Sequence, residues 1–387
     1  MAPLALAALA ASLAYVPQEA LAGPREQAQR LHDRLVGTPP SKDKLDAMAA
    51  RIASNDELGA AHLAIDHRDP ESAPFYNVTL KNFATPWTNR DQTVFAPLND
   101  YTATVIGLVR DELDFRRVLY DDVLYVGSGA GVPAYSPSNN DHYAALENTG
   151  ADLRQVLTRQ AQSALTGLPP EATAGVITSR AAAEAFFIAG TNRAMFRFTL
   201  LNHLCRDLEQ VQDTSRPPDR IRQDVSRSPG GDSRVFLNNC VGCHSGMDPM
   251  AQAFAYYDFD ETSGRLVYTP GQVQPKYFNN KETFPQGFVT PDDRWDNYWR
   301  VGQNKLLGWS SALPGSGKGA KSLGQELASS QAFAQCQVEK VFRQVCYRAP
   351  SDDQDRTAVE RITSLFTGGG YNLKQVFAET AVYCMGD

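Results

Sequence analysis

The chain has 387 residues, of which 42% are hydrophobic and 21% are charged. This composition is that of a globular protein and excludes bulk disorder, and the length allows two or three domains or one large helical domain with additions. The formal net charge of -7 argues against nucleic-acid binding, which requires a basic surface.

The N-terminus has the pattern of an export signal. Residues 3–16 are small or apolar, and Ala20-Leu21-Ala22 provides a signal-peptidase site before Gly23, although no basic residue precedes the apolar run. The alternative is an apolar helix packed on the fold. Residues 1–22 are therefore predicted to be a signal peptide that directs the protein to the periplasm or outside the cell. No later apolar stretch approaches about 20 residues, so we expect no membrane span in the mature chain.

Helical spacing of apolar residues dominates the rest of the chain, as at Ala28, Leu31 and Leu35. We therefore expect a mainly α protein with an embedded haem segment and a C-terminal domain of three helices. The predicted units are a helical and loop region (23–95), a helical domain (96–215), a cytochrome-c-like haem-binding segment (216–325) and the C-terminal helical domain (326–387).

The motif that carries chemistry is Cys240-Val241-Gly242-Cys243-His244. C-x-x-C-H is the attachment sequence for c-type haem: two nearby thiols form thioethers with one haem, and the next histidine binds iron from the proximal side. A zinc site would require a further ligand pair, a redox C-x-x-C would require a βαβ context, and a Cys240–Cys243 disulfide would be strained. The sequence therefore predicts one haem c, with His244 as the proximal iron ligand.

Asp248-Pro249 follows the motif and resembles a helix start. Asp248 is a suitable N-cap and Pro249 suits the first helical position. The pattern predicts a helix that begins there and continues through Phe254 and Tyr257, with its apolar face beside the haem.

The ordered set of motifs resembles a cytochrome-c-like family first catalogued in planctomycetes and common in exported proteobacterial proteins. The haem segment carries the closest resemblance, from Cys240 to Asp260. Other matching positions are Asp100–Thr102, Leu124–Gly127, Thr191–Arg193, Leu204–Cys205, Phe333, Cys336, Val341–Arg343, Cys346, Gly370–Tyr371 and Leu373. The resemblance covers about residues 95–384 and implies an exported monohaem protein, with a helical domain after the haem and no known substrate.

Several residues are candidates for the sixth iron ligand. No histidine follows His244, and the methionines just after the motif would emerge on the proximal side. Upstream, Met195 and His142 are the leading distal candidates, with His203 behind them. Three arginines are expected as partners of the haem propionates: Arg193, Arg197 and Arg265.

Four cysteines remain outside the haem motif, an even number that suits two disulfides in an oxidising compartment. Cys336 and Cys346 lie about 15 Å apart along one predicted helix, too far to bond each other. Two pairings stay open: Cys205–Cys336 with Cys346–Cys384, or Cys205–Cys346 with Cys336–Cys384.

The expected function is electron transfer through the haem to a redox partner protein, because no catalytic constellation accompanies the motif. One alternative is a haem enzyme or gas-binding sensor with an open distal site. Another is a cytochrome subunit of a larger exported complex that docks through the aromatic 262–310 region.

Overall fold

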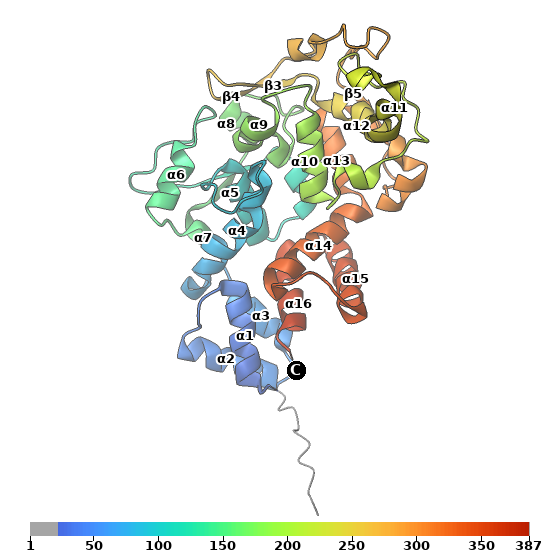
Figure 1. The fold of residues 1–387 in the computed structure, drawn as a ribbon. Helices are drawn as coiled ribbons and strands as arrows, with labels where there is room; N and C mark the ends of the chain where they lie inside the picture. The colour runs from blue at the N-terminus through green and yellow to red at the C-terminus, as the bar shows by residue number, and fades with distance from the viewer. Residues whose placement is uncertain (1–21, 387) are drawn as a thin grey trace, which may run out of the picture.

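The computed structural model describes residues 22–386, and it is mainly helical with three two-stranded sheets (Figure 1). The prediction of a mainly α protein is confirmed. The predicted signal peptide lies, apart from Ala22, outside the described residues.

The first and last helices of the described chain pack together. The N-terminal helices are α1 (Pro24–Val36), α2 (Lys42–Ala53) and α3 (Glu57–Ala64). The C-terminal helices are α14 (Gln331–Cys346), α15 (Asp353–Gly368) and α16 (Leu373–Cys384). Helices α1 and α3 both lie against α16 (Figure 1). The apolar stripe of α1 is buried there, which is the usual reason why an amphipathic helix folds.

The middle of the chain forms short helices around the almost wholly buried α5. These helices are α4 (Leu80–Ala84), α5 (Asp100–Arg110), α6 (Asp141–Asn148), α7 (Leu153–Val156), α8 (Gln162–Thr166), α9 (Arg180–Phe186) and α10 (Arg193–His203). Strands β1 (Leu124–Val126) and β2 (Thr158–Gln160) pair antiparallel, and α5 packs on β1. Apolar and small residues face both sides of α5, so the helix has no polar stripe to present to water.

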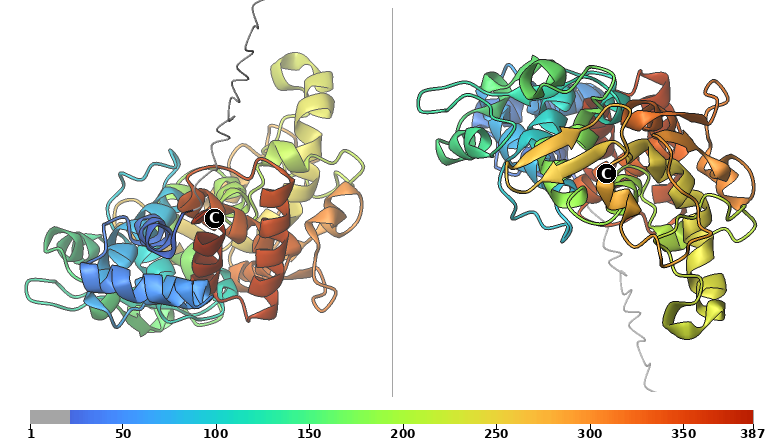
Figure 2. Two further views of the ribbon diagram at one scale, coloured as in Figure 1. Left: turned by 90° about the horizontal axis from the view of Figure 1, so that it is seen from below. Right: turned by 90° about the horizontal axis from the view of Figure 1, so that it is seen from above.

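The motif lies on α12 (Val241–Ala251), which follows the short helix α11 (Ser233–Val235) and a π-helical turn, Phe236–Cys240. Helix α12 packs against α10. Viewed from two further sides, the yellow-green segment that leads from α11 toward α12 projects from the rest of the molecule (Figure 2).

The predicted helix start at Asp248 is wrong. Helix α12 is already formed at Val241, because it continues from the preceding π-helical turn, and Pro249 lies inside it. The carboxylate of Asp248 does not cap a helix start; it accepts from the side chains of Arg193 and His244 and, at 3.5 Å, from Arg222 N.

The same prediction fails at Tyr257, which begins a strand. After a short 3₁₀ turn, β3 (Tyr257–Asp260) pairs antiparallel with β4 (Arg265–Tyr268). The four residues between them carry Gly264 in a left-handed conformation (φ 68°), as a tight turn requires. A third hairpin-like pair, β5 (Arg294–Asp296) with β6 (Ser316–Lys318), leads into α13 (Gly319–Ala328).

Two disulfides fix the C-terminal helices, and they follow the first of the two open pairings. Cys205, just after α10, bonds Cys336 in α14, and Cys346 at the end of α14 bonds Cys384 at the end of α16.

The largest buried apolar cluster extends from Ala28 to Met385. Between residues 22 and 386, no helix is both long and apolar enough to cross a bilayer.

Candidate haem site

Helix α12 is buried along most of its length and reaches the surface at the motif. Within this helix, the two residues that are not buried are Cys243 and His244. Cys240, which immediately precedes the helix, is also partly exposed. Positions i, i+3 and i+4 share one helical face, so the two thiols and the imidazole lie on a common face.

The turn before the motif carries an exposed apolar side chain. Leu237 is 58% exposed and lies three residues before Cys240. Its neighbour Phe236 is buried in a small cluster with Ile221 and Val241, which anchors the turn to the body of the protein.

The opposite side of α12 is held tightly. Gly242 O accepts a bond from Asp213 N at 3.0 Å, and Ser245 Oγ donates to Asp213 O at 3.0 Å. A Cβ at Gly246 would lie 1.9 Å from Nε1 of the buried Trp299, so this approach requires glycine. These contacts leave the motif face as the one free side of this part of the helix.

Both motif thiols are unpaired, whereas the other four cysteines, all within residues 22–386, form disulfides. Cys243 Sγ lies 3.4 Å from Leu208 O, which orients the thiol on the 3₁₀ turn Leu208–Val211. Burial, reinforced by the nearby Cys240, raises the pKa of the Cys243 thiol to about 11. The thiol is therefore protonated at neutral pH.

His244 is oriented by a carboxylate on its own helix. Its Nδ1 lies 3.1 Å from each oxygen of Asp248, one turn further along α12. The acceptor is an ionised carboxylate, so Nδ1 carries the proton and Nε2 keeps its lone pair. Iron-binding histidines commonly show this arrangement, in which one nitrogen binds the metal and the other donates to a carboxylate.

Asp248 is fully buried, and two arginines compensate its charge. Arg193 donates from Nε to Oδ1 at 2.8 Å and from Nη2 to Oδ2 at 3.0 Å. The Arg222 guanidinium lies 4.0 Å from Oδ1. Burial alone would raise the pKa of Asp248, but Arg193, Arg222 and His244 together hold the pKa well below its ordinary value. The group behind His244 is therefore an anion.

A second carboxylate, that of Asp224, supplies a counter-charge for the second arginine, Arg222. Asp224 accepts from Arg193 at 2.8 and 2.9 Å, and Arg222 Nη2 donates to Thr191 Oγ1 at 2.6 Å. The buried cluster thus contains two carboxylates and two guanidiniums. Sequence reasoning missed Asp248, Asp224 and Arg222 as site residues; a helix placed across the whole motif would have shown Asp248 at i+4 from His244.

The expected distal ligands lie away from this face or are already bonded. His142 Nε2 accepts from Gly127 N at 3.0 Å and its Nδ1 pairs with Pro133 O at 2.7 Å, so both nitrogens are engaged. Buried His203 lies 2.7 Å from Tyr101 Oη through Nε2. Met195 is buried about 200° around α10 from Arg193, whose side chain faces α12.

The three arginines expected at the propionates have different surroundings. Arg193 donates to two carboxylates, those of Asp248 and Asp224. Arg265 donates to Thr166 O at the end of α8, at 3.3 Å, and so is directed away from α12. Arg197 is paired with Asp207, whose neighbour Leu208 contacts the Cys243 thiol through its carbonyl oxygen.

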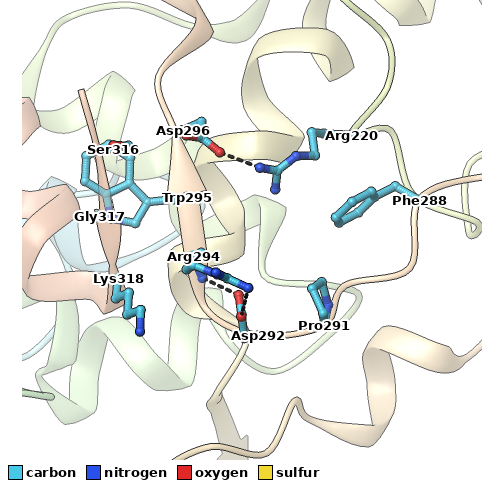
Figure 3. Close-up of a pocket in the computed structure, with 10 residues that line it drawn as sticks. All are labelled: Arg220, Phe288, Pro291, Asp292, Arg294, Trp295, Asp296, Ser316, Gly317 and Lys318. Atoms are coloured by element: carbon cyan, nitrogen blue, oxygen red, sulfur yellow. Dashed lines mark hydrogen bonds and ion pairs between the residues drawn. The ribbon is translucent and has the colours of Figure 1, made fainter. Parts of the chain in front are cut away.

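Two of the three tryptophans in the aromatic 262–310 region are buried, and Trp309 is partly exposed. Trp295 and Trp299 are 2% and 0% exposed, and they pack in the core. A cavity of about 600 Å³ opens beside Trp295, lined also by Arg220, Arg294 and Lys318 (Figure 3). Its acidic residues pair with the arginines, Asp296 with Arg220 and Asp292 with Arg294. The cavity is lined by none of the motif residues.

Among residues 22–386, no three His, Cys, Asp or Glu side chains converge as a metal-holding group. A c-type haem requires a different donor set, two thiols and one histidine nitrogen on one accessible face. Cys240, Cys243 and His244 are the candidate residues for that set.

Compared with family models, curated proteins and solved structures, the chain shows no significant match.

Proposed function

We propose that this protein is an exported c-type cytochrome that binds one haem covalently through Cys240 and Cys243, with His244 as the proximal iron ligand. One observation carries the proposal: α12 is buried except at Cys243 and His244, where the C-x-x-C-H motif meets solvent. A helix that exposes only these two residues presents a ligand-binding face rather than a general surface.

Each motif residue has a defined task. The Cys240 and Cys243 thiols would each add across one vinyl group of the porphyrin, forming a C–S bond and transferring the thiol hydrogen to the neighbouring vinyl carbon. His244 directs Nε2 at the iron, because Asp248 holds Nδ1. The bound haem supplies a one-electron couple.

Export agrees with the cysteine chemistry. Two disulfides link α14 to the end of α10 and to α16, and such bonds persist in oxidising compartments. The N-terminal signal pattern points to the same place, the periplasm or the outside of the cell. The proposed resemblance to the cytochrome-c-like family first catalogued in planctomycetes implies the same location.

Electron transfer to or from a redox partner is the proposed activity. The motif face is partly exposed at Cys240, Cys243 and His244. A haem held there has an edge that a partner protein can approach.

A second candidate, binding of a small ligand such as CO, O₂ or peroxide at the iron, is favoured by a specific observation. The three side chains expected as sixth ligands are engaged elsewhere or face away: His142, His203 and Met195. If the distal position is open, an external ligand takes it.

Absorption spectroscopy of the protein made in a periplasm with a cytochrome c maturation system tests both proposals. We expect haem that survives a denaturing gel, and a pyridine haemochrome of the c type with one haem per chain. Ferrous bands unmoved by CO would identify a six-coordinate electron carrier, and a CO-shifted high-spin spectrum would identify the second candidate.

The matched comparison uses the two kinds of cysteine. Cys240→Ala/Cys243→Ala removes covalent haem completely, whereas Cys346→Ala/Cys384→Ala keeps the haem stain because that pair forms a disulfide. A wild-type protein without covalent haem in that host would overturn the proposed function.

A further inference from the structure

We propose that Asp248 is a positioning residue that sets the strength of His244 as an iron ligand and lowers the reduction potential of the haem. The inference rests on the proposed function, because it concerns the same site. It assigns a task to the buried cluster of Asp248, Arg193, Arg222 and Asp224, which the C-x-x-C-H motif does not explain.

The hydrogen-bond geometry fixes both the ring and the tautomer of His244. Nδ1 lies 3.1 Å from Oδ1 and from Oδ2, so the N–H is centred on the carboxylate. The bond joins residues four apart on one helix, which leaves the imidazole little freedom to rotate. Nε2 therefore points out of α12 toward the accessible motif face.

The carboxylate strengthens the ligand as well as placing it. A hydrogen bond from Nδ1 to an anion raises the electron density on the imidazole and the basicity of Nε2. A more basic ligand stabilises ferric over ferrous iron, so the charge of the hydrogen-bond acceptor favours the ferric state. Removing that charge should move the couple toward the ferrous state.

The surrounding cluster keeps Asp248 anionic and in place. Arg193 bonds both of its oxygens, at 2.8 and 3.0 Å, and Arg222 lies on the same side at 4.0 Å. The Asp248 side chain is 0% exposed, so water does not screen the interaction with His244. Low solvent access makes such a pair electrostatically strong.

Asp224 offers a matched control within the same cluster. It bonds Arg193 through both oxygens, as Asp248 does, but its contacts are with arginines and Thr191 rather than with His244. Asp248→Asn and Asp224→Asn remove the same charge from the same buried group. In Asp248→Asn the acceptor of the His244 Nδ1 bond becomes a neutral amide oxygen, whereas in Asp224→Asn it remains the Asp248 carboxylate.

The test is a spectroelectrochemical titration of the haem-loaded wild type, Asp248→Asn and Asp224→Asn. In Asp248→Asn we expect the ferrous-to-ferric ratio at a fixed potential to rise about tenfold to hundredfold, a midpoint shift of roughly +60 to +120 mV. In Asp224→Asn the shift should be clearly smaller. Equal shifts in the two variants, or none in Asp248→Asn, would overturn the inference.

A measurement on the wild type keeps the inference testable if Asp248→Asn fails to fold. In the low-spin ferrous protein, with CO added where the sixth position is open, NMR should show a downfield His244 Nδ1 proton in slow exchange with water. An Nδ1 proton that exchanges as fast as that of free imidazole would overturn the inference. Wild type without haem would instead overturn the proposed function.

Discussion

The chain uses its six cysteines in two regions with opposite results. At the start of α12, Cys240 and Cys243 lie three residues apart, partly exposed and unpaired. Around α14, four cysteines join elements that are distant in sequence, with separations of 131 and 38 residues. The same side chain is an unpaired thiol in one region, where we propose that haem is attached, and a cross-link in the other.

The difference shows that location, rather than residue type, decides the chemistry of a cysteine. Cys336 and Cys346 are 1% and 6% exposed, and each meets a partner from another element. The thiols of the motif face have solvent on one side, where a prosthetic group can be attached. Helix α10 links the two regions: Arg193 at its start contacts Asp248, and Cys205 just after its end forms a disulfide.

The largest expected effect comes from removing the cross-links. Cys205→Ala/Cys336→Ala opens a 131-residue loop and should lower the free energy of unfolding by about 5 kcal/mol, and Cys346→Ala/Cys384→Ala, with 38 residues, by about 4 kcal/mol. Urea unfolding of the haem-loaded proteins measures both. Loss of haem from either variant while it is still folded would contradict the separation of the two regions.

A smaller decrease in stability, caused by low pH, should come from a histidine in the disulfide region. Burial, aided by Lys340, lowers the pKa of His203 from 6.5 to about 3. Below pH 6.5 the unfolded chain therefore binds a proton that the folded chain does not bind. The free energy of unfolding falls as the pH drops toward 3. We expect the free energy of unfolding to fall by about 2 kcal/mol between pH 7 and pH 4.5.

His203→Gln should flatten that part of the stability profile, measured by urea unfolding at both pH values. His62→Gln is the control, because His62 is partly exposed and bonded to Gln375. A profile for His203→Gln as steep as that of the wild type would show that another group carries the pH dependence. The haem absorption bands should not change in either variant while it stays folded.

The smallest effect is expected at Met195, which lies between the two regions on α10. Its side chain is 2% exposed and faces away from the side of α10 that contacts α12. Met195→Leu should cost less than about 1.5 kcal/mol and leave the ferrous spectrum unchanged. A change from low-spin to high-spin bands in this variant would identify Met195 as the sixth ligand.

Local patterns were sufficient for much of the fold and for the centre of the candidate site. The three C-terminal helices are readable because their apolar spacing and caps are local: Ser330, for example, accepts from Phe333 N at the start of α14. The motif is equally local. The helix boundary was misplaced at Asp248-Pro249 because an Asp-Pro pair is typical of a helix start. In the structure Asp248 lies inside the helix and is buried beside two arginines.

By itself, the sequence determined that the protein is mainly helical, where the motif lies and that four cysteines remain for disulfides. The tertiary structure decided which of these cysteines pair, and that His142 and His203 are occupied by Gly127 and Tyr101. It also brought Arg193, Arg222 and Asp224 to Asp248 from separate segments. Such partners follow from packing, since a buried charge or hydrogen-bonding group must be satisfied by whatever the fold places beside it.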